Sequence, residues 1–123
     1  MGIDCTLLPA AAHDGWGFAH TVLPLERRSD LWPRLRAVEP LPLDVRLIHF
    51  TSYLGRSPSG EHAYGRMAED AYGEQLRFYA AGDLARVISE FDRHPTAAAP
   101  LNAAAAAYLG CLPAESPVAA YWH

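Results

Sequence analysis

Four residues in the middle of the chain have side chains that could act as acid, base or metal ligand. They are His49, His62, Glu69 and Asp70, and the last three fall in one stretch without a clear period. Imidazole and carboxylate groups serve both proton transfer and zinc coordination. Since no His-x-x-x-His or Cys-x-x-Cys spacing accompanies them, the sequence predicts no metal and no cofactor. These residues stay candidates for a pocket between this stretch and a neighbouring sheet.

The same stretch, residues 55–74, contains the triplet Ala-Tyr-Gly twice, at 63–65 and at 71–73. Tyrosine offers a flat apolar face with a polar tip, and the glycine after it lets the backbone turn or approach a ligand closely. One interpretation is a recognition surface for a protein partner, made of Tyr64, Arg66, Glu69, Asp70 and Tyr72 with Trp16. The other is that the tyrosines cover a sheet and the glycines form tight turns.

Trp16 lies between Gly15 and Gly17, on a predicted turn. An exposed tryptophan is a common anchor at protein interfaces. The alternative is that Trp16 closes one end of the core.

Signatures of nucleophilic and nucleotide chemistry are absent from the sequence. Serines and a cysteine occur, but there is no Gly-x-Ser-x-Gly elbow and no glycine-rich phosphate loop. Cys5 and Cys111 share no metal-type spacing, and a chain of 123 residues does not need a disulfide, so two buried thiols are expected. We therefore expect a protein that is not an enzyme, with catalysis in a dispersed site left open.

The charge pattern argues against a nucleic-acid binder. The net charge is −4, and all ten basic residues are arginine. A group of them surrounds the first predicted helix (Arg27, Arg28, Arg34 and Arg36), but the acidic neighbours nearly balance it. A solvated, salt-bridged face is the preferred interpretation over a nucleic-acid patch.

The length and composition predict one domain over residues 1–123. Half of the residues are hydrophobic and one-fifth are charged, as in average globular proteins. No apolar run approaches the roughly 20 residues of a membrane helix. The N-terminal sequence lacks a basic leader, so a cytoplasmic protein is expected. A homodimer is compatible with the sequence but is not required by it.

Periodicity predicts an α+β fold with a single mixed, mostly antiparallel sheet of about five strands and three helices, in the order β-β-α-β-β-α-α-β. The predicted strands are 2–8, 17–25, 44–53, 75–79 and 118–123. The predicted helices are 31–38, 82–92 and a third that begins near Pro100 and ends at Gly110. We expect the first two strands to form a hairpin or neighbouring pair and the last strand to lie beside the first.

Three local details of this scheme are specific enough to test. Pro9 is expected to end the first strand, in which Ile3, Cys5 and Leu7 form the buried face. The third helix is expected to direct five residues inward, namely Leu101, Ala105, Tyr108, Leu109 and Leu112.

The sequence thus favours a small protein-recognition module, an inhibitor or accessory subunit, that presents the 55–74 loop to a protein partner. The alternative is a small enzyme or ligand-binding protein with a pocket between that loop and the sheet, using His49, His62, Glu69 and Asp70.

Overall fold

A computed structural model describes residues 2–13, 15–19, 21–28, 30–43, 45–50, 65–92 and 99–123. The strands are β1 (Cys5–His13), β2 (Gly15–Ala19), β3 (Leu23–Pro24), β4 (Val45–Phe50), β5 (Gly65–Met67), β6 (Phe78–Ala80) and β7 (Pro117–Trp122). The helices are α1 (Leu31–Arg36), α2 (Ala81–Asp92) and α3 (Pro100–Gly110). These elements confirm the predicted α+β class.

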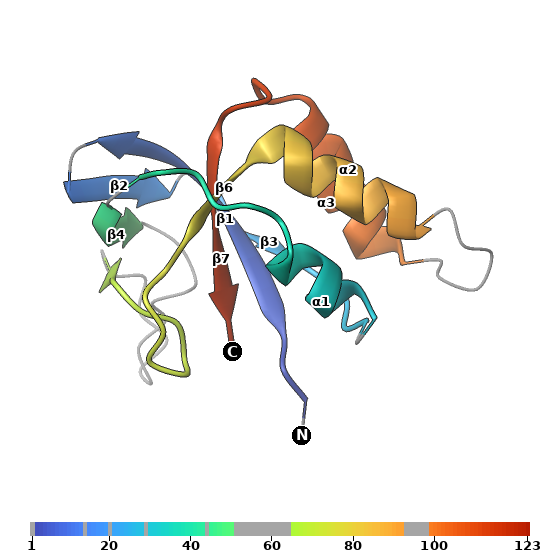
Figure 1. Ribbon diagram of the computed structural model, residues 1–123, viewed down its shortest axis with the longest axis horizontal. Helices are drawn as coiled ribbons and strands as arrows, with labels where there is room; N and C mark the ends of the chain where they lie inside the picture. The colour runs from blue at the N-terminus through green and yellow to red at the C-terminus, as the bar shows by residue number, and fades with distance from the viewer. Residues whose placement is uncertain are drawn as a thin grey trace.

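The described strands form one mixed sheet that is organised around β1. They follow the order β5-β4-β2-β1-β7-β6, and β3 pairs with β1 beside this path. Residues 5–9 of β1 pair with β7, and residues 10–13 pair with β2. In Figure 1, β2 and β4 turn to one side of β1 while β6 and β7 stay beside it. The predicted pairing of the last strand with the first is confirmed.

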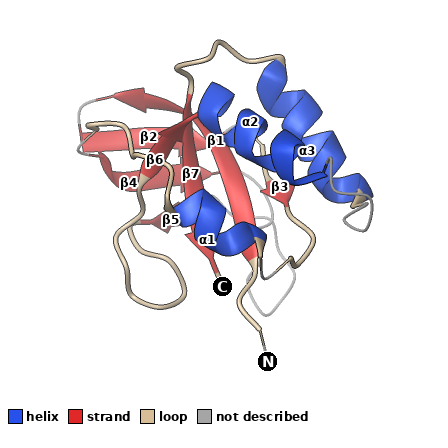
Figure 2. Ribbon diagram, turned by 45° about the vertical axis from the view of Figure 1, so that its right-hand side comes forward, coloured by secondary structure: helices blue, strands red, loops and turns tan. Residues whose placement is uncertain are grey.

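All three helices cover one face of the part of the sheet formed by β1, β6 and β7 (Figure 2). Their apolar faces enter one core, which contains Leu7, Leu31, Leu84, Ile88, Leu109 and Val118 at no more than 1% exposure. Burial of such side chains contributes roughly 1.5–3 kcal/mol each relative to exposure. This helix-side core is therefore a major source of stability.

A second core lies on the opposite face of β1. It is built by Leu8, Ala10, Ala19, Ile48, Leu76, Phe78 and Ala119. Leu7 and Leu8 enter different cores because successive side chains of a strand point to opposite faces. The prediction that β1 has only one buried face was wrong: Thr6 and Leu8 are buried, and Ile3 is 39% exposed.

β1 continues through Pro9, contrary to the predicted end at that residue. Pro9 is paired with Val118 of β7. It lies where the other neighbour of β1 changes from β3, at residues 6 and 7, to β2, which begins to pair at Ala10. A missing backbone donor is tolerated where a ladder is interrupted.

Several other strand boundaries differ from prediction. The predicted strand 17–25 divides into β2 and β3, and the predicted strand 75–79 corresponds to β6 at 78–80. The predicted loop 55–74 contains β5, which pairs with β4. The expected β1–β2 hairpin is confirmed, and Gly15 at its turn has φ +82°.

The three predicted helices are present, but the buried face of α3 differs from prediction. Leu101 and Tyr108 are 49% and 38% exposed, so their predicted inward orientation was wrong. The buried side chains are Asn102, Ala105, Ala106 and Leu109, which follow the spacing of one helix face. Because α3 contains no charged residue, its sequence does not reveal which face is buried.

Asn102 and Glu26 connect α3 to the segment after β3. The buried amide of Asn102 accepts a hydrogen bond from the Glu26 backbone N–H at 2.7 Å and donates one to the Glu26 carbonyl at 3.4 Å. The Glu26 carboxylate accepts the Leu101 backbone N–H at 3.4 Å. A carboxylate at the N-terminus of α3 accepts a backbone N–H that has no partner within the helix, and its negative charge complements the helix dipole.

Within the described residues, no helix has the length and apolar character needed to cross a bilayer.

Candidate functional site

The described end of the 55–74 loop folds into a tight hairpin over residues 68–76. Its turn is held by Asp70, whose carboxylate Oδ1 accepts the backbone N–H groups of Tyr72 at 2.8 Å and Glu74 at 3.1 Å. The Asp70 backbone N–H donates to the Glu74 carbonyl at 2.8 Å. Gly73 has φ +81°, a conformation that costs a residue with a side chain roughly 1–2 kcal/mol.

The hairpin is attached to the rest of the molecule at its base and along one arm. Glu69 and Gln75 form an antiparallel bridge, and Leu76 enters the second core. The Ala71 backbone N–H donates to the carbonyl of Trp122, in β7, at 3.0 Å. These bonds hold the turn against the sheet.

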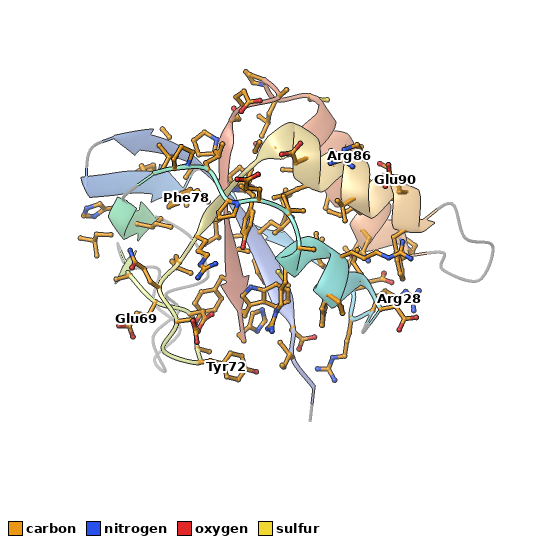
Figure 3. The ribbon with its side chains drawn as sticks, in the orientation of Figure 1. Arg28, Glu69, Tyr72, Phe78, Arg86 and Glu90 are labelled. Atoms are coloured by element: carbon orange, nitrogen blue, oxygen red, sulfur yellow. The ribbon has the colours of Figure 1, made fainter. Side chains whose placement is uncertain are left out.

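Tyr72 occupies the turn of this hairpin and is 54% exposed. Figure 3 shows Tyr72 and Glu69 at the outer edge of the hairpin, with Phe78 farther inside. A large aromatic side chain on a fixed backbone loses little conformational freedom when a partner covers it. Tyr72 therefore has the character of a preorganised contact residue.

An open cavity of about 470 Å³ lies next to Tyr72. The hairpin, α1, β7 and the segment leading to β6 all contribute to its wall. The lining residues are Ile3, Arg36, Asp70, Tyr72, Glu74, Gln75, Arg77, Tyr79, Ala120 and Trp122.

The aromatic wall of the cavity is fixed by packing. The Trp122 ring meets Trp32 edge to face, with centroids 5.6 Å apart, and the Trp32 Nε1–H donates to the Ile3 carbonyl at 2.7 Å. The Arg36 guanidinium lies over the Trp122 ring, 4.4 Å from its centroid. Cation and ring attract each other in this arrangement. The wall thus combines a buried indole with an exposed arginine.

The charged lining residues are separated into two groups. Asp70 and Glu74 belong to the hairpin, whereas Arg36 belongs to α1 and Arg77 precedes β6. Burial raises the pKa of the Tyr79 phenol, while the charges of Arg77 and Arg36 act in the opposite direction. Arg36, Arg77 and Tyr79 all line the cavity, and we call these three residues its cationic corner.

The structure brings only part of the predicted partner-binding set together. Asp70 and Tyr72 line the cavity, whereas Glu69 is exposed and is not one of its lining residues. Arg66 is in β5, paired with His49 of β4. Trp16 lies in β2, where the backbone pairs with β1 and β4. Tyr64 lies outside the described residues.

Three of the residues predicted for an acid–base pocket are described, and of these Asp70 alone lines the cavity. His49 is half-buried in β4, Glu69 is exposed, and His62 lies outside the described residues. Among the residues that the structure describes, no three histidine, cysteine or acidic side chains gather as metal ligands would.

The arginines around α1 have two kinds of contact. Arg27 forms a paired salt bridge with Asp4, with N–O distances of 2.8 and 2.9 Å. Arg34 lies over the Phe91 ring at 5.4 Å, and Arg36 lies over Trp122. Arg28 lies 3.9 Å from the Glu26 carboxylate, so the predicted salt-bridged face describes Arg27 and Arg28, whereas Arg34 and Arg36 contact aromatic rings.

Sequence reasoning missed Arg36, Arg77, Tyr79 and Trp122 as cavity residues. Arg77 and Tyr79 are two residues apart, but long stretches of chain separate them from Arg36 and from Trp122, and the four residues match no known motif. The alternation of β7 would have indicated only that Trp122 faces a core.

Comparison of the chain with protein-family models, curated proteins and solved structures gave no match.

Proposed function

We propose that this chain is a protein-recognition module, an inhibitor or accessory subunit, that binds a protein partner through the 68–76 hairpin and the cavity beside it. The observation that carries the proposal is Tyr72, half exposed on a turn that Asp70 and Gly73 hold in one conformation. Interfaces concentrate their binding energy in a few aromatic and arginine side chains. Tyr72 and Arg36, which both line the cavity, are of these types.

The proposal is tested by capturing partners from a lysate of the source organism with the tagged protein and then measuring affinity for the purified partner. Tyr72→Ala is expected to weaken binding at least about tenfold, since central aromatic contacts are often worth more than 1.4 kcal/mol. The matched control is Tyr108→Ala, which removes an exposed tyrosine from α3. Equal affinities of the two variants would contradict the proposal.

A second pair of variants distinguishes the effect of the turn geometry from the effect of the negative charge of Asp70. Asp70→Asn keeps an oxygen that accepts the Tyr72 and Glu74 N–H groups, whereas Asp70→Ala removes it. We expect Asp70→Ala to lower partner affinity more than Asp70→Asn does, because the hairpin loses its fixed geometry. Circular dichroism would verify that each variant remains folded.

The second candidate function is that of a small enzyme or ligand-binding protein, and the cavity volume favours it. A volume of about 470 Å³ falls within the roughly 300–1,000 Å³ of small-molecule sites. Native mass spectrometry of the gently purified protein tests this candidate. A bound small-molecule mass that disappears in a cavity variant such as Arg77→Gln would support it over protein recognition.

A further inference from the structure

Three side-chain groups that line the cavity beside Tyr72 donate hydrogen bonds but lack protein acceptors in the described part of the chain. Neither the Arg36 nor the Arg77 guanidinium has a hydrogen bond or ion pair to another described residue, and neither does the Tyr79 hydroxyl. Among the described residues, the contact of the Arg36 guanidinium is with the ring of Trp122. A contact with a ring face uses none of the N–H donors of a guanidinium.

These donors converge because of the strand pairing. The Ala120 backbone N–H donates to the Arg77 carbonyl at 3.3 Å, which fixes the start of the Arg77 side chain beside β7. Tyr79 follows two residues later, and its backbone pairs with Val118. Arg36 reaches the same place from the end of α1, over Trp122. All three side chains line the same cavity.

The other charges of the lining limit which anion suits this corner. Asp70 and Glu74 balance the two arginines, so the cavity as a whole has no net charge. A phosphate monoester carries about −1.5 to −2 at neutral pH and is repelled more strongly by these acids than a carboxylate with a single charge. A carboxylate also matches the fork of an arginine.

We propose that this corner, formed by Arg36, Arg77 and Tyr79, receives the carboxylate of an aspartate or glutamate side chain of the protein partner. The proposal rests on the proposed function, because Tyr72 lines the same cavity and a partner that covers Tyr72 would present its side chains there. The acid would accept hydrogen bonds from the guanidinium groups and the phenol. Its neighbours in the partner would contact Tyr72.

The first test uses a capped pentapeptide, acetyl-Gly-Phe-Glu-Phe-Gly-amide, and its glutamine counterpart as probes. Two-dimensional NMR would follow backbone and indole N–H signals during titration. We expect the glutamate peptide to shift the signals of Trp122 and Ala120 and to bind at least about tenfold more tightly than the glutamine peptide, as charge-assisted hydrogen bonds imply. Equal binding of the two peptides would overturn the proposal.

The protein variants for this test have a close control. Arg36→Gln combined with Arg77→Gln should abolish the preference for the glutamate peptide. Arg34→Gln removes the same charge from α1 at an arginine that lies over Phe91 and outside the cavity, and it should leave the preference unchanged. If the double variant does not fold, Arg77→Gln alone gives the same comparison. If the Arg34 and Arg77 variants lose the preference for the glutamate peptide equally, the preference comes from long-range charge attraction and not from binding at the corner.

The inference and the proposed function fail in different ways. Suppose that Tyr72→Ala abolishes partner capture while the double arginine variant binds the partner normally. The corner then does not bind an acidic side chain of the partner, but the proposed recognition of a partner by the hairpin is supported. If no partner is captured but the glutamate peptide binds the corner, recognition by the hairpin is wrong and the chemistry of the corner stands. Inorganic phosphate is the third probe. If it binds more tightly than the glutamate peptide, the corner prefers phosphate to a carboxylate, and the proposal is overturned.

Discussion

The guanidinium carbon of Arg36 lies 4.4 Å from the centroid of the Trp122 ring, and this contact joins the end of α1 to the end of β7. With the cation in place, Trp122 is 8% exposed. Such pairs contribute about 0.5–1 kcal/mol at exposed sites and more when they are desolvated. The contact thus stabilises the fold and also shapes one wall of the cavity.

Replacement of Arg36 should therefore cost stability as well as charge. We expect Arg36→Gln to lower the free energy of unfolding by about 0.5–1 kcal/mol. Arg34→Gln should cost less, because Arg34 lies 5.4 Å from the Phe91 centroid. Urea denaturation followed by tryptophan fluorescence measures both. A larger loss for Arg34→Gln would show that the ring contacts are not the cause.

Gly73 and Gly110 provide a matched pair of glycine substitutions. A Cβ at either position meets no atom within 4 Å, but Gly73 has φ +81°. Gly73→Ala should lower the free energy of unfolding by roughly 1 kcal/mol through backbone strain, whereas Gly110→Ala in α3 should raise it by about 0.5–1 kcal/mol. Chemical denaturation of both variants tests the opposite signs. Two changes of the same sign would contradict the described turn.

The Asp4–Arg27 pair predicts a dependence of stability on acid pH. The Arg27 hydrogen bond holds the pKa of Asp4 below its ordinary value of 3.8. Between the folded and unfolded pKa values, the unfolded chain binds more protons, so stability rises with pH there. The contribution is present above 3.8 and is lost as the pH falls through the folded pKa.

Asp4→Asn isolates this contribution from that of the other carboxylates. The unmodified protein should lose more of its free energy of unfolding between pH 6 and pH 3 than Asp4→Asn does, and added salt should reduce the difference. Denaturation midpoints at both pH values provide the measurement. Parallel losses would mean that the pair does not act in solution.

The two thiols should differ strongly in reactivity. Burial raises the pKa of the Cys5 thiol to about 12, with the charge of Arg36 acting in the other direction, while Cys111 is exposed. Because the thiolate is the reactive form, an aromatic disulfide reagent at pH 8 should modify Cys111 rapidly and Cys5 only after unfolding. Cys111→Ser should remove the rapid phase. The prediction of two buried thiols was wrong for Cys111.

The Cys5 thiol also predicts a loss of stability at alkaline pH. Its folded pKa of about 12 is above the ordinary value of 9.0, so the folded protein retains a proton that the unfolded chain releases. The contribution is complete below pH 9 and is lost as the pH rises toward 12. Cys5→Ala should have a flatter pH profile of thermal stability above pH 9. An unchanged slope would exclude Cys5 as the cause.

The elements with a clear period were predictable from the sequence, but the faces of two of them were not. Leu31, Trp32 and Leu35 follow helical spacing, and α1 buries them as predicted. In α3 every position is apolar or small except Asn102, so helical spacing alone does not identify the buried face. For β1, alternation suggested one buried face because nothing local indicates that the strands carrying Ala19 and Ile48 cover the other.

The hairpin could have been predicted more sharply than the cavity. Asp70 followed by Gly73 matches a common turn pattern, with an acidic residue first and glycine fourth. That signal is local. Arg36 and Trp122, in contrast, meet only because residues 5–9 of β1 pair with β7, and no pattern within either segment encodes the contact.

The pairing of residues 5–9 with residues 118–122 also has a consequence for folding kinetics. The two segments lie at opposite ends of the described chain, so their pairing closes a very long loop. The chain loses the entropy of that loop before the strand contacts stabilise it. Topologies dominated by such distant contacts fold slowly. Until β7 pairs with β1, one edge of β1 is exposed and can pair with other chains. Early folding intermediates are therefore prone to association.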